Sequence, residues 1–197
     1  MKNITILNKK IGIDQSVYFI ADIAANHDGN LERAKDLIYL AAESGADAAK
    51  FQNFRADTIV SDFGFRALGG KFSHQSNWQK SIYEVYEAAA LPLAWTETLK
   101  EVCKDAGIHY FTAPYDKDLV RLLSPHVCAW KIGSGDITWL EHIENIAQDG
   151  KPVMLATGAA DWEDVNRAVN AILARNKELV LMQCNTNYTG SKNNLKF

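Results

Sequence analysis

Residues 153–184, VMLATGAADWEDVNRAVNAILARNKELVLMQC, contain the repeating unit that decides the fold. The two ends of this stretch, Val153–Ala156 and Leu179–Cys184, are apolar almost throughout, as expected of strands buried on both faces. Between them, Trp162–Ala174 carries apolar residues at helical spacing, and Asp161 is placed to cap its first turn. A strand, a helix and a strand in this order predict one unit of a parallel sheet.

The same alternation extends over most of the chain. Four more apolar runs predict strands, at Tyr18–Ala24, Ala46–Phe51, His109–Ala113 and Ala129–Ile132. Helical patterns lie between several of these runs, at Leu31–Glu43, Leu93–Asp105 and Leu140–Gln148, closed by Gly45, Gly107 and Gly150. Six strands alternating with helices predict an α/β fold with a parallel sheet.

Two segments depart from this alternation. Residues 1–16 predict a short hairpin ahead of the sheet, because Ile4–Leu7 and Ile11–Ile13 flank the polar turn Asn8-Lys9-Lys10. We therefore divide the chain into an N-terminal hairpin, 1–16, and an α/β portion, 17–197. Residues 55–90 form an unusually long connection, for which we predict a helix at Trp78–Ala89 and a functional role.

Composition narrows the class of protein. The 197 residues carry 21 basic and 24 acidic side chains, a formal net charge of -3, so there is no basic surplus for nucleic-acid binding. No apolar run is long enough to span a bilayer, and no membrane partner is expected. The three cysteines are far apart, as is typical of thiols in a reducing compartment, and with no signal peptide in view we expect a cytoplasmic protein.

Polar residues gather where the predicted strands end. Because parallel strands end at one face, Lys50 and Lys131 are expected to meet there, with Asp22 and Asp136 nearby. One interpretation is a structural network in which the two aspartates neutralise the two lysines. The other is a clamp for an anion, to which Ser134 and glycine-flanked backbone amides add neutral donors. A Schiff base on a strand-end lysine is a third possibility.

Five motifs, in order along the chain, resemble the sialic acid synthase family, which makes N-acetylneuraminate and related nine-carbon acids. They are residues 19–29 (FIADIAANHDG), 45–52 (GADAAKFQ), 111–116 (FTAPYD), 131–136 (KIGSGD) and 150–158 (GKPVMLATG). The resemblance implies a TIM (β/α)8-type barrel that condenses phosphoenolpyruvate with an N-acetylated hexosamine, typically N-acetylmannosamine, and releases phosphate. It also implies a divalent metal, Mn²⁺ or Mg²⁺, and a homodimer of the full-length enzyme.

The resemblance also assigns roles to residues of this chain. Substrate-anion binding is implied for Lys50, Thr112, Lys131 and Ser134. Asp22 would work near the reacting carbons, and Gln52 and Asp136 would face the substrates. The sugar would contact Asn187 and Tyr188. Three positions depart from the family habit: aspartate replaces glutamate at 22 and 136, and Ala156 stands where serine is usual.

Six strands fall short of the eight in such a barrel, so we expect an incomplete barrel, about six of eight units, without the family's C-terminal antifreeze-like domain. The family's metal-binding histidines would lie beyond Phe197, so no residue of this chain is assigned to the metal. Asn194–Phe197 resembles the first turn of a further helix. Two other functions stay open: a non-catalytic fragment that binds phosphate or sugar, and a Schiff-base aldolase that uses Lys131.

Overall fold

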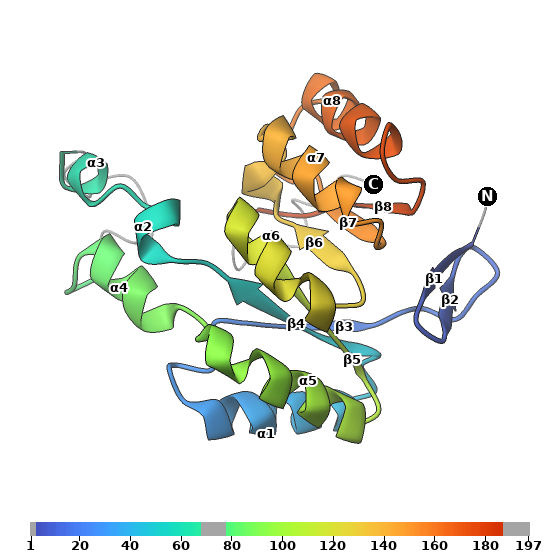
Figure 1. Cartoon of the computed structure of the whole chain (residues 1–197), viewed down its shortest axis with the longest axis horizontal. Helices are drawn as coiled ribbons and strands as arrows, with labels where there is room; N and C mark the ends of the chain where they lie inside the picture. The colour runs from blue at the N-terminus through green and yellow to red at the C-terminus, as the bar shows by residue number, and fades with distance from the viewer. Residues whose placement is uncertain (1–2, 68–77, 187–197) are drawn as a thin grey trace.

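The computed structural model describes residues 3–67 and 78–186. Its main feature is a six-stranded parallel sheet, in which each strand pairs with the next along the chain in the order β3-β4-β5-β6-β7-β8. The sheet curls without closing, so the predicted incomplete barrel is confirmed (Figure 1). The strands are β3 Ile20–Ala24, β4 Ala48–Asn53, β5 His109–Pro114, β6 Trp130–Ile132, β7 Val153–Ala156 and β8 Leu179–Met182.

Helices follow the strands and cover the outer face of the sheet (Figure 1). Neighbouring helices pack on one another, α1 on α5, α6 on α7 and α7 on α8. Their bounds are α1 Leu31–Glu43, α5 Thr96–Asp105, α6 Lys117–Leu123, α7 Leu140–Gln148 and α8 Trp162–Leu173. Short 3-10 turns precede or follow some of them, at η2 Leu93–Trp95, η3 Ser124–His126 and η4 Ser134–Asp136.

Capping residues explain where the helices begin and end. The Asp161 side chain accepts a hydrogen bond from the Asp164 N–H at 2.8 Å, which starts α8 where the sequence predicts it. Gly45, Gly107 and Gly150 follow α1, α5 and α7 with φ of 85°, 75° and 76°, a conformation that glycine adopts at little cost. These local signals are why most helix bounds were predictable.

In its described residues, the long connection after β4 contains the short helices α2 Ala56–Ile59, α3 Asp62–Ala67 and α4 Ile82–Ala89, which project from one side of the sheet (Figure 1). The predicted start of a helix at Trp78 was wrong. The Ser81 side chain caps the Glu84 N–H and the Glu84 carboxylate reaches back to the Ser81 N–H, so α4 begins at Ile82. Helix α6 was missed in the sequence, although Asp116 caps it through the Leu119 N–H at 2.8 Å.

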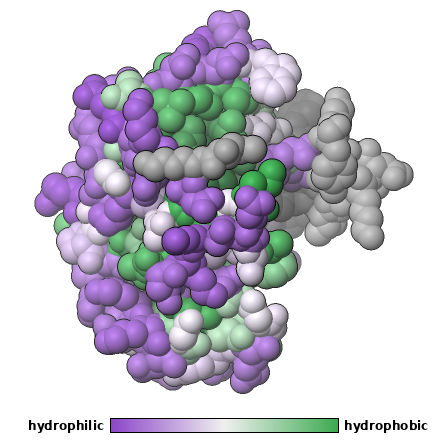
Figure 2. Space-filling model, turned by 90° about the vertical axis from the view of Figure 1, so that its right-hand side faces the viewer, coloured by the Kyte–Doolittle hydropathy of each residue, from purple (hydrophilic) through white to green (hydrophobic). Residues whose placement is uncertain are grey.

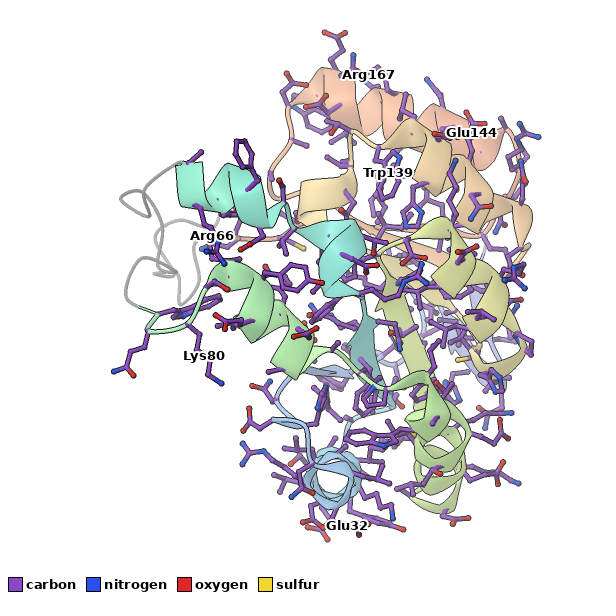
Figure 3. All side chains as sticks on the ribbon, turned by 60° about the vertical axis from the view of Figure 1, so that its left-hand side comes forward. Glu32, Arg66, Lys80, Trp139, Glu144 and Arg167 are labelled. Carbon is purple, nitrogen blue, oxygen red and sulfur yellow. The ribbon has the colours of Figure 1, made fainter. Side chains whose placement is uncertain are left out.

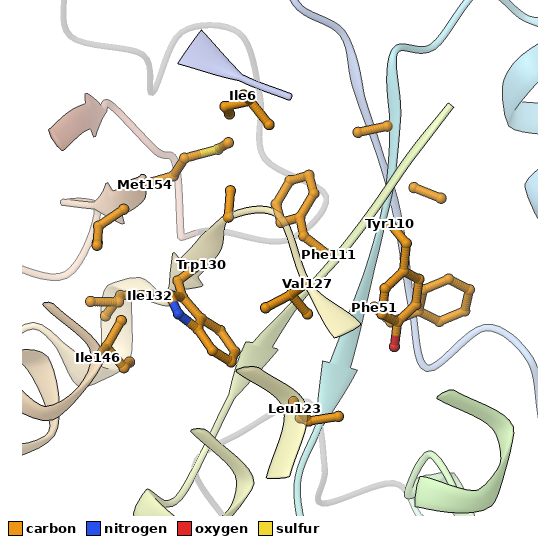
Figure 4. Close-up of a cluster of buried hydrophobic side chains, with 14 of the residues drawn as sticks. Ile6, Phe51, Tyr110, Phe111, Leu123, Val127, Trp130, Ile132, Ile146 and Met154 are labelled. Atoms are coloured by element: carbon orange, nitrogen blue, oxygen red, sulfur yellow. The ribbon is translucent and has the colours of Figure 1, made fainter. Parts of the chain in front are cut away.

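The predicted N-terminal hairpin is present as β1, Ile4–Ile6, paired antiparallel with β2, Lys9–Ile11. The predicted turn at Asn8-Lys9-Lys10 was wrong, because the chain turns at residues 7–8 and both lysines lie in β2. It closes the end of the sheet where the strands begin. Ile6 is fully buried and lies near Phe111 and Met154 (Figure 4). Polar contacts fix its turn: the Asn8 side-chain oxygen is 2.9 Å from Nε2 of His109, and Lys9 forms an ion pair with Asp47 at 2.8 Å. The hairpin therefore belongs to the core.

The two outer strands of the sheet, β3 and β8, each pair on one side only. Apolar side chains reach the surface at both: Phe19, next to β3, is 59% exposed, and Leu181 of β8 is 49% exposed. Figure 2 shows apolar areas interrupting the hydrophilic surface on the side it presents. Of the helices in the described ranges, none has the length and apolar character needed to cross a bilayer.

Candidate active site

The site begins with a lysine on the inner face of the sheet. In β4, Lys50 lies in register with Asp22 of β3, and its Nζ is 2.8 Å from Asp22 Oδ1. The Lys50 side chain is only 8% exposed, whereas that of Asp22 is 62% exposed. Gln52, two residues further along β4, shares this face because side chains alternate along a strand. The structural pairing that the sequence left open is therefore present for Lys50 and Asp22.

Lys131 of β6 is the second cation of the site, and among residues 3–67 and 78–186 it has no carboxylate partner at ion-pair distance. Its Nζ donates to the backbone carbonyl of Ile132 at 2.9 Å. Burial lowers the pKa of Lys131, and the positive charge of Lys50 lowers it further. The two ammonium groups repel each other in a site partly shielded from water. An anion bound between them would relieve that repulsion, so the pair favours anion binding.

Neutral donors border this cation pair at the ends of β6 and β7. The Ser134 Oγ accepts a hydrogen bond from the Gly158 N–H at 3.0 Å, which ties the two strand ends together. Only glycine fits at 158, because a Cβ there would lie 2.6 Å from the Cys184 carbonyl oxygen. The hydroxyl hydrogen of Ser134 stays free to donate to a ligand.

Asp136, at the end of the turn η4, supplies a carboxyl group with an altered acidity. Burial raises its pKa, and the charges of His142 and Lys131 partly oppose that rise. Its Oδ2 lies 3.2 Å from the position that a Cβ on Gly133 would occupy. A carboxyl group whose pKa lies above the ordinary aspartate value is better suited to acid–base chemistry than an unperturbed one.

Thr112 is not brought to this group. Its hydroxyl donates to the side-chain oxygen of Asn53 at 2.7 Å, and both residues are buried. Asn53 is three residues from Lys50 on the same strand, so its side chain points to the opposite, helix-covered face. The structure thus separates Thr112 from Lys50 and Lys131, against the placement that the resemblance implied. Asn187 and Tyr188 lie outside the described residues.

Three side chains near the site were not selected from the sequence. Tyr115 follows β5, and its hydroxyl lies 3.6 Å from the same Gly133 Cβ position that Asp136 approaches. Cys184 acts electrostatically on Lys131. His142 is 1% exposed and acts on Asp136. Tyr115 and Cys184 each follow a strand, which was a usable signal, whereas His142 lies within helix α7 and its isolated position gave none.

The metal that the resemblance implies has no ligand set among residues 3–67 and 78–186. Within those ranges, no three His, Cys, Asp or Glu side chains gather closely enough to hold an ion. The described residues therefore do not form a metal centre by themselves.

A family model and curated proteins both match most of this chain. The model of the NeuB family matches residues 37–197. The chain belongs to the NeuB family. It is 32% identical over 189 residues to the N,N'-diacetyllegionaminic acid synthase of Legionella pneumophila, an alignment covering 93% of this chain and 52% of the relative. This member of the NeuB family spans about half the length of that curated relative.

Solved structures of other proteins show the same fold. The N-acetylneuraminic acid synthetase of Leptospira borgpetersenii, crystallised with citrate, superposes with a TM-score of 0.82 at 26% identity, over 97% of this chain and 62% of that one. A truncated 3-deoxy-D-arabino-heptulosonate 7-phosphate synthase from Thermotoga maritima superposes with a TM-score of 0.63 at 14% identity, over 91% and 55% of the two chains. That second likeness shows the barrel-type fold alone.

Proposed function

We propose that this NeuB-family chain carries the phosphoenolpyruvate-binding half of a nonulosonic acid synthase. The full reaction joins phosphoenolpyruvate to an N-acetylated hexosamine such as N-acetylmannosamine and releases phosphate. The observation that carries the proposal is the pair of inner-face lysines, Lys50 and Lys131, of which only Lys50 has a carboxylate partner within the part of the chain that the structure describes. Family membership supports the same substrate class.

The charges match this substrate. Phosphoenolpyruvate carries a phosphate and a carboxylate, so it brings several negative charges to one small molecule. Lys131 and Lys50 would bind these groups, with the Ser134 hydroxyl as a neutral donor. Binding of the anion would also relieve the repulsion between the two ammonium groups, which makes the site more favourable for an anion than for water.

The bond changes balance with one water molecule as the only further reactant. Carbon 3 of phosphoenolpyruvate attacks the open-chain aldehyde of the sugar, which forms one carbon–carbon bond. Water adds at carbon 2, and the carbon–oxygen bond to phosphate then breaks. Asp136, with its raised pKa, would give or accept the proton that these steps move, and Asp22 would act beside Lys50, with which it forms an ion pair.

The two relatives described above are named for different acids, legionaminic and N-acetylneuraminic. We therefore propose a class of sugar, an N-acetylated hexosamine, and an activity assay would identify the individual sugar. Metal dependence and a homodimer also stay as proposals drawn from the resemblance, and a cytoplasmic location stays as a proposal drawn from the separated cysteines and the lack of a signal peptide.

Calorimetric titration of the chain with phosphoenolpyruvate tests the proposal. We expect saturable binding that Lys131→Met weakens about 100-fold, the scale of a lost charge-assisted contact to a buried anion. Lys177→Met, which removes an exposed lysine bonded to the Leu173 carbonyl, should leave affinity unchanged. Equal affinity in Lys131→Met and the unsubstituted chain would contradict the proposal.

Two further assays separate the alternatives. Phosphate release with N-acetylmannosamine and Mn²⁺ distinguishes a synthase from a fragment that binds without turnover. Borohydride reduction in the presence of pyruvate tests the aldolase, because a Schiff base on Lys131 would be trapped as a stable adduct seen by mass spectrometry. A trapped adduct at Lys131 would replace the synthase proposal with the aldolase.

A further inference from the structure

The N-terminal hairpin is attached to the sheet by hydrogen bonds to one imidazole. His109, the first residue of β5, is 9% exposed, and its Nε2 lies 2.9 Å from the side-chain oxygen of Asn8, in the turn between β1 and β2. Its Nδ1 lies 2.7 Å from the hydroxyl of Tyr18, which precedes β3. Both ring nitrogens are therefore occupied, one by the hairpin and one by the segment that enters the sheet.

The two partners fit the neutral form of the His109 ring. An amide oxygen can only accept, so Nε2 carries the hydrogen that is donated to Asn8. In a neutral imidazole the other nitrogen is then an acceptor, and the Tyr18 hydroxyl donates to it. Burial raises the pKa of this hydroxyl, so Tyr18 keeps its proton at neutral pH.

A second proton on His109 is unfavourable where the ring lies. Burial lowers the pKa of His109, and the positive charge of Lys9 lowers it further, whereas the Asp47 carboxylate opposes these two effects. Lys9 and Asp47 form an ion pair with each other at 2.8 Å. The hairpin therefore supplies both a hydrogen-bond acceptor for the neutral ring and a positive charge that acts against the protonated one.

We propose that the contacts of His109 with Asn8 and Tyr18 form a pH-sensitive switch, which holds the hairpin on the sheet while the ring is neutral and loosens it when the ring takes up a second proton. Opening of the hairpin would expose the ring to water, where a histidine titrates near pH 6.5. The closed state binds that proton less tightly than the open state. The contribution of His109 to closure is therefore fully present above about pH 6.5 and falls as the pH drops below it. Burial of Ile6 does not depend on pH, so acid weakens the attachment and does not abolish it.

The outer helices bring no unpaired charge to His109 within the described part of the chain. Charged side chains on these helices point away from the sheet, as Glu32, Glu144 and Arg167 do (Figure 3). The lysines of α5 that border the pocket next to His109 are in ion pairs, Lys100 with Glu97 at 3.4 Å and Lys104 with Glu101 at 3.0 Å.

The other titratable groups on this side are paired, neutral or exposed. His126 borders the same pocket and is paired with Glu97 at 2.6 Å. Burial raises the pKa values of the Cys128 thiol and the Tyr110 hydroxyl, so both stay neutral. Lys10 of β2 is exposed. Among the described groups around the hairpin, His109 is therefore the buried one whose charge changes just below neutral pH.

Amide hydrogen exchange in the intact chain tests this switch, read by mass spectrometry on peptides that cover β1 and β2. A two-stranded hairpin is barely stable by itself, so its amides exchange once it leaves the sheet. Protection factors correct for the intrinsic effect of pH on exchange. We expect protection to fall by up to about tenfold from about pH 7.5 to about pH 5.5, because the latter lies one unit below the pKa of a free histidine.

His109→Gln is the deciding variant. Its side chain keeps an N–H for Asn8 and an oxygen for the Tyr18 hydroxyl but does not titrate, so hairpin protection should stay constant over this pH range. The control is His126→Gln, which removes the histidine paired with Glu97 and should keep the whole fall. Equal falls in His109→Gln and the unsubstituted chain would overturn the proposal, as would constant protection in the unsubstituted chain.

A direct titration covers the case in which His109→Gln does not fold. Nitrogen-15 NMR of the His109 ring in the unsubstituted chain should give a midpoint below about 6.5, the value of a free histidine. A midpoint at or above that value would overturn the proposal, because the closed hairpin would then favour the protonated ring. Neither readout uses phosphoenolpyruvate, so this proposal and the proposed function are tested separately.

Discussion

The two ends of the curled sheet differ sharply in what they bury. Where the hairpin packs on the sheet, Ile6 and the sheet residues Phe111 and Met154 form an apolar floor (Figure 4). The same inner face carries Lys50 and Lys131, and Asp136 follows β6 toward the strand ends. Lys50 is in register with Phe111 and Lys131 with Met154, so the change from apolar to charged side chains occurs between neighbouring strands.

This difference teaches which end serves folding and which serves chemistry. Burial of apolar side chains stabilises the folded chain by roughly 25 cal/mol for each Å² removed from water. Burial of a charged group that lacks a partner does the reverse, because the ion loses its hydration. The lowered pKa of Lys131 and the raised pKa of Asp136 are both signs of that cost. The free energy gained by burying the apolar floor offsets the cost of burying these charged groups.

The largest effect is expected from removing the floor. Phe111→Ala should lower the free energy of unfolding by about 3–5 kcal/mol, since Phe111 is fully buried and the hairpin and sheet cannot collapse completely into the space left. Urea unfolding measures it. Phe63→Ala, which changes a side chain that is 85% exposed, is the control and should shift stability by less than about 0.5 kcal/mol. Similar losses in both variants would break the comparison.

A medium effect on stability, with none on binding, is expected at Thr112. Thr112→Val removes the donor to the buried Asn53 oxygen. The Asn53 amide nitrogen already lacks a partner among the described residues, so stability should fall by about 1–3 kcal/mol. Affinity for phosphoenolpyruvate should not change, because the hydroxyl faces away from Lys50. Thr98→Val on the surface of α5 is the matched control. Lost affinity in Thr112→Val would restore Thr112 to the site.

The smallest effect is a pH-dependent gain at Asp136. Because burial raises the pKa of Asp136, the folded chain holds this proton more tightly than the unfolded chain does. Ionisation therefore lowers stability as pH rises from the ordinary aspartate pKa through the folded value. Asp136→Asn should match the unsubstituted chain at low pH and become the more stable of the two across that window. Urea unfolding at several pH values checks this, and a crossing in the other direction would contradict it.

Much of the fold was predictable because its signals are local. The strand Val153–Ala156 and the helices Leu31–Glu43 and Leu140–Gln148 have the bounds that the sequence predicts, since apolar period and glycine caps mark both ends. Helix α6 was missed because it is one of the shorter helices, at seven residues, and its cap Asp116 lies within a motif that drew attention for other reasons.

The sequence predicted which strands carry the candidate site residues. It was less successful in predicting which face of the sheet each side chain is on. Strand ends placed Lys50, Lys131, Ser134 and Asp136 together, because parallel strands share a direction. Thr112 shows the limit: a shift of one residue moves a side chain to the opposite face, and the sequence does not set that register. His142 shows another, because its partner, the Pro114 carbonyl, is 28 residues away in sequence.

The central claim is that the charged end of the sheet lowers stability and holds the substrate anion, and Lys131→Met tests both halves in one preparation. In the unfolded chain a lysine titrates near 10.4, whereas burial lowers the pKa of Lys131 in the folded chain, so below that pH the unfolded state binds the proton more tightly. We predict that Lys131→Met unfolds at higher urea concentration than the unsubstituted chain at neutral pH and loses affinity for phosphoenolpyruvate. A variant that unfolds more easily and still binds phosphoenolpyruvate would contradict the account.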